Sequence, residues 1–193
     1  MDISIKEEKQ KIRIKLKKIR EDIPLKIIDL KSKAIWESLK TDREYINAKV
    51  VMFYSSINNE VRTDFMIRET LLIGKKVVLP QTTPYALIPR VISDYPSGLF
   101  PKKFGILEPN ESFPIIEKDK IDIVVVPGLA FSKECSRLGY GKGYYDKFLK
   151  DYKGKKIGVA FWEQIIDNLP YEHYDVLLDK IITDKIVINC NKN

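Results

Sequence analysis

The hydrophobic positions of this chain follow a helical period at the start and a mixture of strand and helix patterns afterwards. Apolar residues recur at spacings of three and four from Ile3 to Asp22 and again from Pro24 to Lys40, so both stretches predict amphipathic helices. Short apolar runs and helical patterns then alternate. We expect strands at residues 50–54, 76–80, 85–92, 124–126, 156–161 and 180–188, and helices at 63–72 and from 144 onward. This order predicts a three-layer α/β domain with a mostly parallel central sheet, spanning residues 1–193 as a single domain.

The first predicted helix carries a basic stripe beside its apolar one. Lys9 and Arg13 lie one turn apart and could hold two phosphate oxygens together, Arg as a fork and Lys as a point charge. We interpret the other three basic residues of the stripe as solvated surface; they are Lys6, Lys17 and Arg20. The apolar stripe, which we expect to face the core, consists of Ile12, Leu16, Ile19 and Ile23.

The most informative segment has the sequence VVVPGLAFSKECSRLGYGKGYYD, from Val124 to Asp146. An apolar strand ends at Pro127, and after a loop glycines occupy positions 139, 141 and 143 before a helical pattern begins. Glycine lets backbone N–H groups approach a ligand, a helix start offers unpaired donors, and Arg137 and Lys142 add positive charge. Asp146 could hold the Mg2+ that accompanies a nucleoside triphosphate. The segment therefore suggests a polyphosphate site, although glycine spacing alone fits a structural turn as well and matches neither the P-loop nor the dinucleotide-binding fingerprint.

Five other segments carry recognisable motifs in a fixed order. They are KQKIR at 9–13, YSSINNEVRT at 54–63, FGILEP at 104–109, AFWEQ at 160–164, and HYD at 173–175 followed by LD at 178–179 and TD at 183–184. Together with PGLAF and RLGYGKGYYD, they resemble the signature elements of the 5-formyltetrahydrofolate cyclo-ligase family, also called 5,10-methenyltetrahydrofolate synthetases. The resemblance covers nearly the whole chain, and the combination is far more specific than any single motif.

This resemblance implies a fold similar to the NagB/RpiA/CoA-transferase-like fold and an ATP-dependent cyclo-ligase. The implied reaction converts 5-formyltetrahydrofolate to 5,10-methenyltetrahydrofolate, ADP and phosphate with Mg2+, through a phosphorylated formyl iminium that N10 attacks. The resemblance implies catalytic roles for Arg137 and Lys142, and Mg2+ binding by Asp146 and Asp179. The ATP-binding residues that it implies are Lys9, Gln10, Lys11, Ile12, Arg13, Arg137, Leu138, Gly139, Tyr140, Gly141, Lys142, Gly143, Tyr144 and Tyr145. The implied substrate-binding residues are Ser55, Glu60, Tyr140, Gly141, Lys142, Gly143 and Tyr144.

The residues alone leave several of these roles open. Asp179 fits a strand-flanking surface acid almost as well as a metal ligand, and a loop residue such as Glu60 is ordinarily solvated. Tyr145 has the spacing of a core residue, whereas Tyr144 is the better candidate for contact with a ligand. His173 is the only histidine, and a structural or surface position in a turn is its more frequent environment.

Composition limits which class of protein this chain can belong to but does not identify its function. The chain has 193 residues, of which 44% are hydrophobic and 32% charged, as in ordinary globular enzymes. The net charge of +7 favours an anionic partner, either nucleic acid or a polyanionic small molecule. The start of the chain lacks a signal-peptide pattern and no apolar run is long enough for a bilayer. We therefore expect a cytoplasmic monomer that binds 5-formyltetrahydrofolate, with or without a polyglutamate tail, and neither nucleic acid nor membrane.

The two cysteines, Cys135 and Cys190, lie in no metal-ligand spacing. In a reducing cytosol we expect them not to form a disulfide. With one histidine and no evident partner for it, a catalytic thiol is a poor explanation as well, so we interpret Cys135 as an incidental loop residue.

Two rival functions follow from the same features. A sugar-phosphate isomerase or CoA-transferase-like enzyme could share this scaffold without using ATP, so a nucleotide-binding requirement for Arg137 and Lys142 would distinguish the cyclo-ligase from it. A small basic nucleic-acid-binding protein should carry aromatic residues among its basic ones, and the basic stripe of the first helix lacks them.

Overall fold

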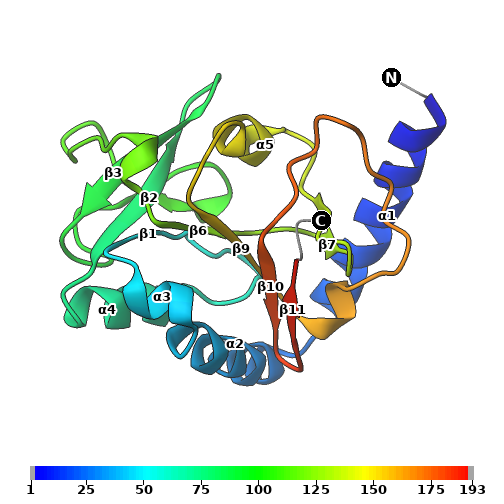
Figure 1. Ribbon diagram of the computed structural model, residues 1–193, viewed down its shortest axis with the longest axis horizontal. Coiled ribbons are helices and arrows are strands. Elements are labelled where there is room, and N and C mark those ends of the chain that lie inside the picture. The colour runs from blue at the N-terminus through cyan, green and yellow to red at the C-terminus, as the bar shows by residue number, and fades with distance from the viewer. Residues whose placement is uncertain (1–2, 191–193) are drawn as a thin grey trace.

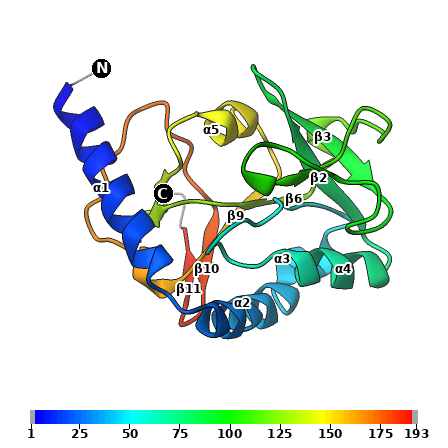
Figure 2. The ribbon, with the colours of Figure 1, turned by 180° about the vertical axis from the view of Figure 1, so that it is seen from behind.

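The protein is described by a computed structural model that covers residues 3–190. These residues form a seven-stranded sheet with helices on both faces (Figure 1, Figure 2). The helices are α1 Ile3–Glu21, α2 Leu25–Lys40, α3 Arg43–Asn47, α4 Asp64–Leu72 and α5 Tyr144–Leu149. The strands are β1 Val50–Met52, β2 Lys76–Thr82, β3 Leu87–Ile92, β4 Phe100–Pro101, β5 Leu107–Glu108, β6 Ile123–Val126, β7 Ala130–Phe131, β8 Arg137–Leu138, β9 Lys155–Ala160, β10 Lys180–Thr183 and β11 Val187–Asn189.

The sheet has the order β11-β10-β9-β6-β1-β2-β3. The five central strands run parallel, with Val51 opposite Val77 on one side and Ile123 on the other. The two edge strands, β3 and β11, are antiparallel to their neighbours. The mostly parallel α/β architecture predicted from the sequence is confirmed. Pro89 lies in an edge strand of the main sheet, opposite Pro80 of β2, and its carbonyl oxygen accepts from the backbone N–H of Ile116 on the outer side.

Neighbouring residues of each central strand point into two different cores because side chains alternate across a sheet. Val51 and Val77 pack with α2 and α4, whereas Met52 and Val78 pack on the opposite face with α5. Ile123 to Val126 is buried throughout, as expected for a strand covered on both faces. Figure 1 shows this layering, with α2, α3 and α4 below the sheet and α5 above it.

Helix α1 does not pack on the sheet as a layer helix would. Its buried Leu16 contacts Ala130 of β7 and Leu138 of β8, and Ile12 and Ile19 pack around them. β7 and β8 form a two-stranded antiparallel hairpin, which we call the 130–138 hairpin. The apolar stripe of α1 therefore faces the core as predicted, but that core is a small separate one beyond the edge of the main sheet.

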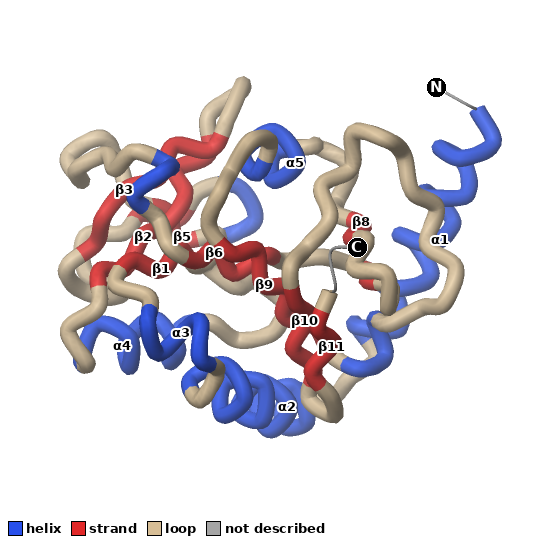
Figure 3. Tube along the Cα trace, in the orientation of Figure 1, coloured by secondary structure: helices blue, strands red, loops and turns tan. Residues whose placement is uncertain are grey.

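The structure adds elements that the hydrophobic pattern did not indicate. The short helix α3, the 130–138 hairpin and the pair β4–β5 all lie in segments expected to be loop. Strands of two residues are too short to show an alternation, so no periodic signal exists for them. Most of the chain between β6 and α5 is loop (Figure 3). Within residues 3–190, no helix combines the length and the apolar character that crossing a membrane requires.

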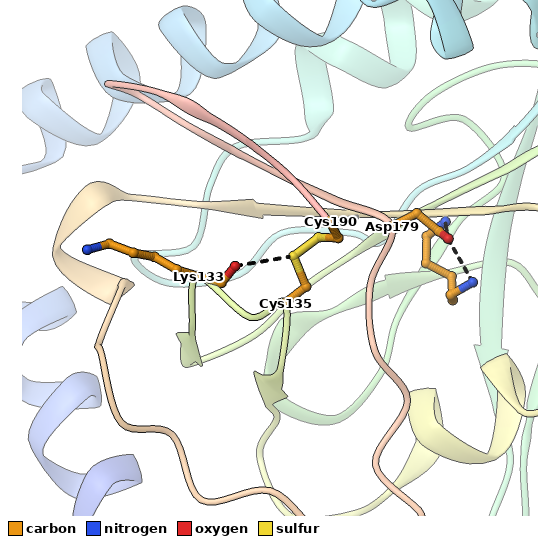
Figure 4. Close-up of a disulfide and its surroundings, with 5 residues drawn as sticks. Lys133, Cys135, Asp179 and Cys190 are labelled. Atoms are coloured by element: carbon orange, nitrogen blue, oxygen red, sulfur yellow. Dashed lines mark hydrogen bonds and ion pairs between the residues drawn. A yellow bond between two sulfur atoms is a disulfide. The ribbon is translucent and has the colours of Figure 1, made fainter. Parts of the chain in front are cut away.

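Cys135 and Cys190 form a disulfide, contrary to the expectation from the sequence. Cys135 occupies the turn of the 130–138 hairpin at a φ of 68°, and Cys190 follows β11, so the bond ties the end of the sheet to the hairpin (Figure 4). Their Cα atoms are 5.9 Å apart, inside the range that a disulfide requires. The sequence-based expectation came from the reducing cytosol assumed for the protein. The two cysteines come together because β11 turns back antiparallel to β10. Cys135 is 1% exposed and is thus a buried structural residue, not an incidental one.

Candidate functional site

The predicted site residues come from α1 and from three loops that follow β1, β6 and β9. Parallel strands place their carboxyl ends at one edge of a sheet, which is where ligands bind in such folds. Gln164, after β9, donates through Nε2 to the carbonyl oxygens of Gly128 at 2.9 Å and Leu129 at 3.1 Å. These two hydrogen bonds fix the start of the segment that leads to the glycines at positions 139, 141 and 143. The edge is therefore a continuous surface made of residues that are far apart in the sequence.

Residues 139–143, which we call the glycine loop, need their glycines for two different reasons. Gly141 and Gly143 have φ values of 92° and 68°, which residues with a side chain rarely adopt. Gly139 has no such angle, but a methyl group there would lie 2.6 Å from Nη1 of Arg137. Lys142 is exposed at the centre of the loop and forms no ion pair with any residue that the structure describes. It is a cation available to an anionic ligand.

Arg13 and Lys9 of α1 both lie at this site, and both already have partners. Arg13 donates from Nε to the carbonyl oxygen of Gly139 at 3.0 Å, which fastens the glycine loop to the helix. Nζ of Lys9 is 2.7 Å from Glu172 and 2.6 Å from Asp175, in a largely buried ion pair with the loop before β10. The hydrogen bond from Lys9 lowers the pKa of Glu172. Phosphate binding by Lys9 stays a prediction, since its ammonium faces two carboxylates here.

Arg137 and Asp146 pair with each other. Nη2 of Arg137 lies 2.9 Å from Oδ1 of Asp146, and Nη1 donates to the carbonyl oxygen of Pro127 at 3.3 Å. The guanidinium is almost fully buried, lies over the Tyr145 ring, and its Nε has no hydrogen-bond partner among the described residues. A buried Arg with an unused donor is costly unless something else accepts from it.

The two aspartates implied for Mg2+ binding lie in different surroundings. Asp179 precedes β10 at the amino end of the strands and forms an ion pair with Lys156, 2.7 Å away. Within residues 3–190 there is no group of three or more His, Cys, Asp or Glu side chains that could hold a metal ion. Helix α5 has only six residues, so the helix start that the sequence suggested as an anion site is weak. Of these two aspartates, Asp146 lies in the first turn of α5, directly after the glycine loop.

Several residues implied for ATP binding also contribute side chains to the hydrophobic cores. The side chains of Ile12 and Leu138 pack in the small core under α1, and Tyr145 packs against both main cores. The core spacing noted for Tyr145 is thus confirmed. Gln10 and Lys11 are exposed on α1. Leu138 is buried, whereas Ile12 is only half-buried.

The substrate-binding residues implied by the resemblance lie in the glycine loop, directly after it, and in the loop after β1. Glu60, after β1, is 6% exposed and accepts a 2.5 Å hydrogen bond from the Tyr140 hydroxyl. Ser55 is buried and donates to the carbonyl oxygen of Leu107 at 2.5 Å. Tyr144 donates from its hydroxyl to the carbonyl oxygen of Thr83 at 3.0 Å. The expectation of a solvated Glu60, which the residues alone favoured, is wrong.

Arg20 is the residue that the sequence analysis missed. It was interpreted as solvated surface, yet it is 5% exposed and donates from Nη2 to the Tyr140 hydroxyl at 2.6 Å. A signal existed, because Arg20 follows Arg13 by seven residues and therefore lies on the same helix face. The pattern could not reveal that the glycine loop covers this face.

A cavity of about 450 Å3 lies next to the Arg137–Asp146 pair, a size typical of ligand sites. Asp146 and Lys150 of the α5 segment line one side, and His173 and Tyr174 line the other. His173 is exposed and packs edge-on against Tyr174, in agreement with a surface position. The loop that carries these residues runs beside α1 in both ribbon views (Figure 1, Figure 2).

Comparison with known proteins agrees with the motifs. A model of the 5-formyltetrahydrofolate cyclo-ligase family matches residues 5–184. The chain belongs to this family. A probable 5-formyltetrahydrofolate cyclo-ligase of Caenorhabditis elegans is 30% identical over 93% of this chain and 94% of its own. The 5-formyltetrahydrofolate cyclo-ligase of Haemophilus influenzae is 30% identical over 91% of this chain and 97% of its own.

Solved structures of cyclo-ligase family members share the fold. The 5,10-methenyltetrahydrofolate synthetase of Aquifex aeolicus superposes with a TM-score of 0.86 at 32% identity, over 96% of this chain and 94% of that one. The 5,10-methenyltetrahydrofolate synthetase of Mycoplasma pneumoniae gives a TM-score of 0.74 at 26% identity, over 96% and 100% of the two chains. The predicted family and the predicted enzyme class are confirmed. Membership of the cyclo-ligase family favours an enzyme over a nucleic-acid-binding module.

Proposed function

We propose that this protein converts 5-formyltetrahydrofolate to 5,10-methenyltetrahydrofolate with ATP and Mg2+, releasing ADP and phosphate. One observation carries the proposal: the glycine loop closes on α1 and Glu60, with the free cation Lys142 at its centre. A cationic loop beside a buried carboxylate offers two kinds of contact, one for a polyphosphate and one for a ring that carries N–H groups. The family to which the chain belongs supports this pair of ligands.

The chemistry explains why a nucleotide is needed. The formyl oxygen on N5 is amide-like and leaves poorly, so direct ring closure by N10 is slow. In the proposed reaction the formyl oxygen attacks the γ-phosphorus, and the bond between that phosphorus and the ADP oxygen breaks. N10 then adds to the activated carbon, and the C–O bond breaks with release of phosphate and of the N10 proton. Phosphoryl transfer of this kind depends on positioning and on charge compensation more than on a nucleophilic side chain.

Charge compensation would come from Lys142 and the guanidinium groups around it. Lys142 is free to approach the transferring group, and Arg13 is held by the carbonyl oxygen of Gly139 next to it. The unused Nε of buried Arg137 is a donor for which a phosphate oxygen would be a suitable acceptor. Glu60, aligned after β1, would accept hydrogen bonds from the pterin.

Asp146 fits a magnesium site of the kind that nucleotides bring with them. Mg2+ keeps several waters and usually takes one or two carboxylates plus phosphate oxygens, so a cage of acidic residues is not required. The Asp146 side chain is 27% exposed next to Arg137, which leaves its second oxygen accessible. Bound there, the ion would neutralise charge on the phosphates. The role of this chain's own residues is to hold the nucleotide and the folate at a fixed distance.

An absorbance assay tests the proposal. Purified protein with 5-formyltetrahydrofolate, ATP and Mg2+ should develop the methenyl chromophore, and omission of any one of the three should stop it. Lys142→Ala should lower kcat by about 100-fold or more, the usual result of losing a positioned charge. Lys147→Ala is the matched control, since Lys147 is an exposed lysine outside the glycine loop. A wild-type protein without turnover would refute the function.

The magnesium ligand has its own test. Asp146→Asn keeps an oxygen that can accept the hydrogen bond from Arg137 but removes the negative charge, so it weakens metal binding while that hydrogen bond can persist. We expect Asp146→Asn to raise the Mg2+ concentration needed for half-maximal turnover at saturating ATP. An unchanged Mg2+ requirement would remove Asp146 from the metal site.

A further inference from the structure

The buried guanidinium of Arg20 is not explained by the fold. Arg20 lies in the last turn of α1, where its side chain is 5% exposed. Its Nε has no hydrogen-bond partner among the described residues. Burial of an arginine costs free energy unless its charge and its donors are used. The partners of the Arg20 charge and of its remaining donors must therefore compensate for its burial.

Arg20, Tyr140 and Glu60 form a compact polar cluster. The Tyr140 hydroxyl donates to Oε1 of Glu60 at 2.5 Å and accepts from Nη2 of Arg20 at 2.6 Å. Nη1 of Arg20 lies 3.8 Å from the same Oε1. Oε2 of Glu60 accepts from the backbone N–H of Ile57 at 3.1 Å. Both carboxylate oxygens are thus held, one by the loop of Glu60 itself and one by α1 and the glycine loop together.

The order of the donors in this cluster is fixed. Burial and the neighbouring Glu60 carboxylate raise the pKa of Tyr140, so its hydroxyl keeps its proton. Tyr140 must therefore donate to Glu60 and accept from Arg20, because a guanidinium has no acceptor. Its ring also lies 5.7 Å from the Arg20 guanidinium carbon. One tyrosine on the glycine loop thereby joins a cation of α1 to a carboxylate after β1.

The end of α1 is tied to the same loop by a second set of bonds. Asn59, the residue before Glu60, donates from Nδ2 to the carbonyl oxygens of Arg20 and Glu21, each at 3.1 Å. These carbonyls are at the helix end, where no intrahelical donor remains. Side chain and backbone of Arg20 are therefore both fastened to the loop that carries Glu60. The register between α1 and this loop is set at Arg20.

We propose that Arg20 is a positioning residue for the folate. It holds the Glu60 carboxylate oriented toward the substrate ring, and it holds the glycine loop in place through Tyr140. The inference rests on the proposed function, because it assigns to Arg20 the alignment of a folate-binding group. Arg20 itself touches neither the nucleotide nor the reacting atoms, so its effect passes through Glu60 and Tyr140.

Steady-state kinetics with three variants test the proposal. Arg20→Met keeps most of the volume but removes the charge, and should raise KM for 5-formyltetrahydrofolate at least about tenfold while KM for ATP changes by less than about threefold. Arg20→Lys keeps a cation near Glu60 and should restore part of the loss. Lys17→Met is the matched control, because Lys17 is an exposed cation of the same helix. We expect the control to match the wild type.

The outcomes separate this inference from the proposed function. Wild-type protein that neither binds nor converts the folate ends both. Active wild-type protein whose folate KM is unchanged in Arg20→Met ends the inference alone, and so does an equal rise of both KM values. If Arg20→Met does not fold, Tyr140→Phe decides, since it removes only the hydroxyl that links the two charges. A raised folate KM in Tyr140→Phe supports the proposal, and an unchanged one overturns it.

Discussion

Reduction of the Cys135–Cys190 disulfide should destabilise the protein strongly. The bond closes a segment of 55 residues and links the end of β11 to the turn of the 130–138 hairpin. A cross-link mainly restricts the unfolded chain, and for a loop of this length the chain-entropy relation gives about 4 kcal/mol at 25 °C. Thermal unfolding of a chain of this size shifts by about 2–4 °C per kcal/mol. The expected fall in melting temperature on reduction is therefore roughly 8–16 °C.

The measurement compares oxidised and reduced protein in the same buffer. Alkylation before and after treatment with a dithiol reductant establishes the redox state, since both cysteines should take up label only after reduction. Melting curves by circular dichroism then give the shift. The double variant Cys135→Ala plus Cys190→Ala is the control, because its melting temperature should be low and indifferent to the reductant. Cys135→Ala also leaves a small cavity at a site that is 1% exposed, which further lowers the stability of the double variant.

Two results would refute this reasoning. One is oxidised protein in which both thiols react with label before reduction, which would mean that no bond forms. The other is a reduced protein, verified by labelling, that melts within about 2 °C of the oxidised form. The second result would show that the hairpin and β11 stay together through packing alone.

Three further predictions concern single residues. The hydrogen bond from Lys9 lowers the pKa of Glu172 in the folded state. The stabilisation that Glu172 contributes is therefore complete at a pH above its ordinary pKa of 4.5 and is lost as the pH falls through the lowered pKa. When stability is measured by urea unfolding at a series of acidic pH values, Glu172→Gln should lack this loss. Gly158→Ala would place a methyl group 2.7 Å from Cδ1 of Leu178, and should cost about 1–3 kcal/mol in urea unfolding; an unchanged midpoint would contradict the packing described. Gly141→Ala places a residue with a side chain at a φ of 92°, so turnover should fall while the melting temperature changes by only a few degrees. Wild-type turnover would show that the glycine loop tolerates another conformation.

The sequence predicted the sheet well because its central strands are buried on both faces. Residues 123–126 are continuously apolar, and Gly74 and Pro24 mark helix ends that the structure confirms within a residue or two. The 130–138 hairpin escaped prediction because two-residue strands carry no period. The disulfide escaped it because the closeness of Cys135 and Cys190 depends on where β11 returns, which no local pattern encodes.

The candidate site could be predicted as a set of segments but not as a set of contacts. The motifs identified the glycine loop, Glu60 and residues 9–13 as separate segments, and in the structure the glycine loop contacts both Arg13 and Glu60. The partners of the charged side chains could not be predicted, since Lys9 forms an ion pair with a distant loop and Asp179 forms one with Lys156 of β9. Charged residues on a helix look solvated in a sequence, whereas Arg20 shows that a loop from 120 residues away can cover them.

Helix α1 is attached to the molecule differently from the helices that cover the sheet. Helix α1 packs on the 130–138 hairpin and is fastened by polar bonds to the glycine loop and to the loop after β1, while the sheet keeps its own two cores. A helix held in this way can detach at a lower free energy than the whole molecule. Native-state hydrogen exchange should therefore find α1 opening as an independent unit, with the amides of the parallel strands still protected. Opening of this kind would expose the glycine loop while the scaffold of the sheet stays intact.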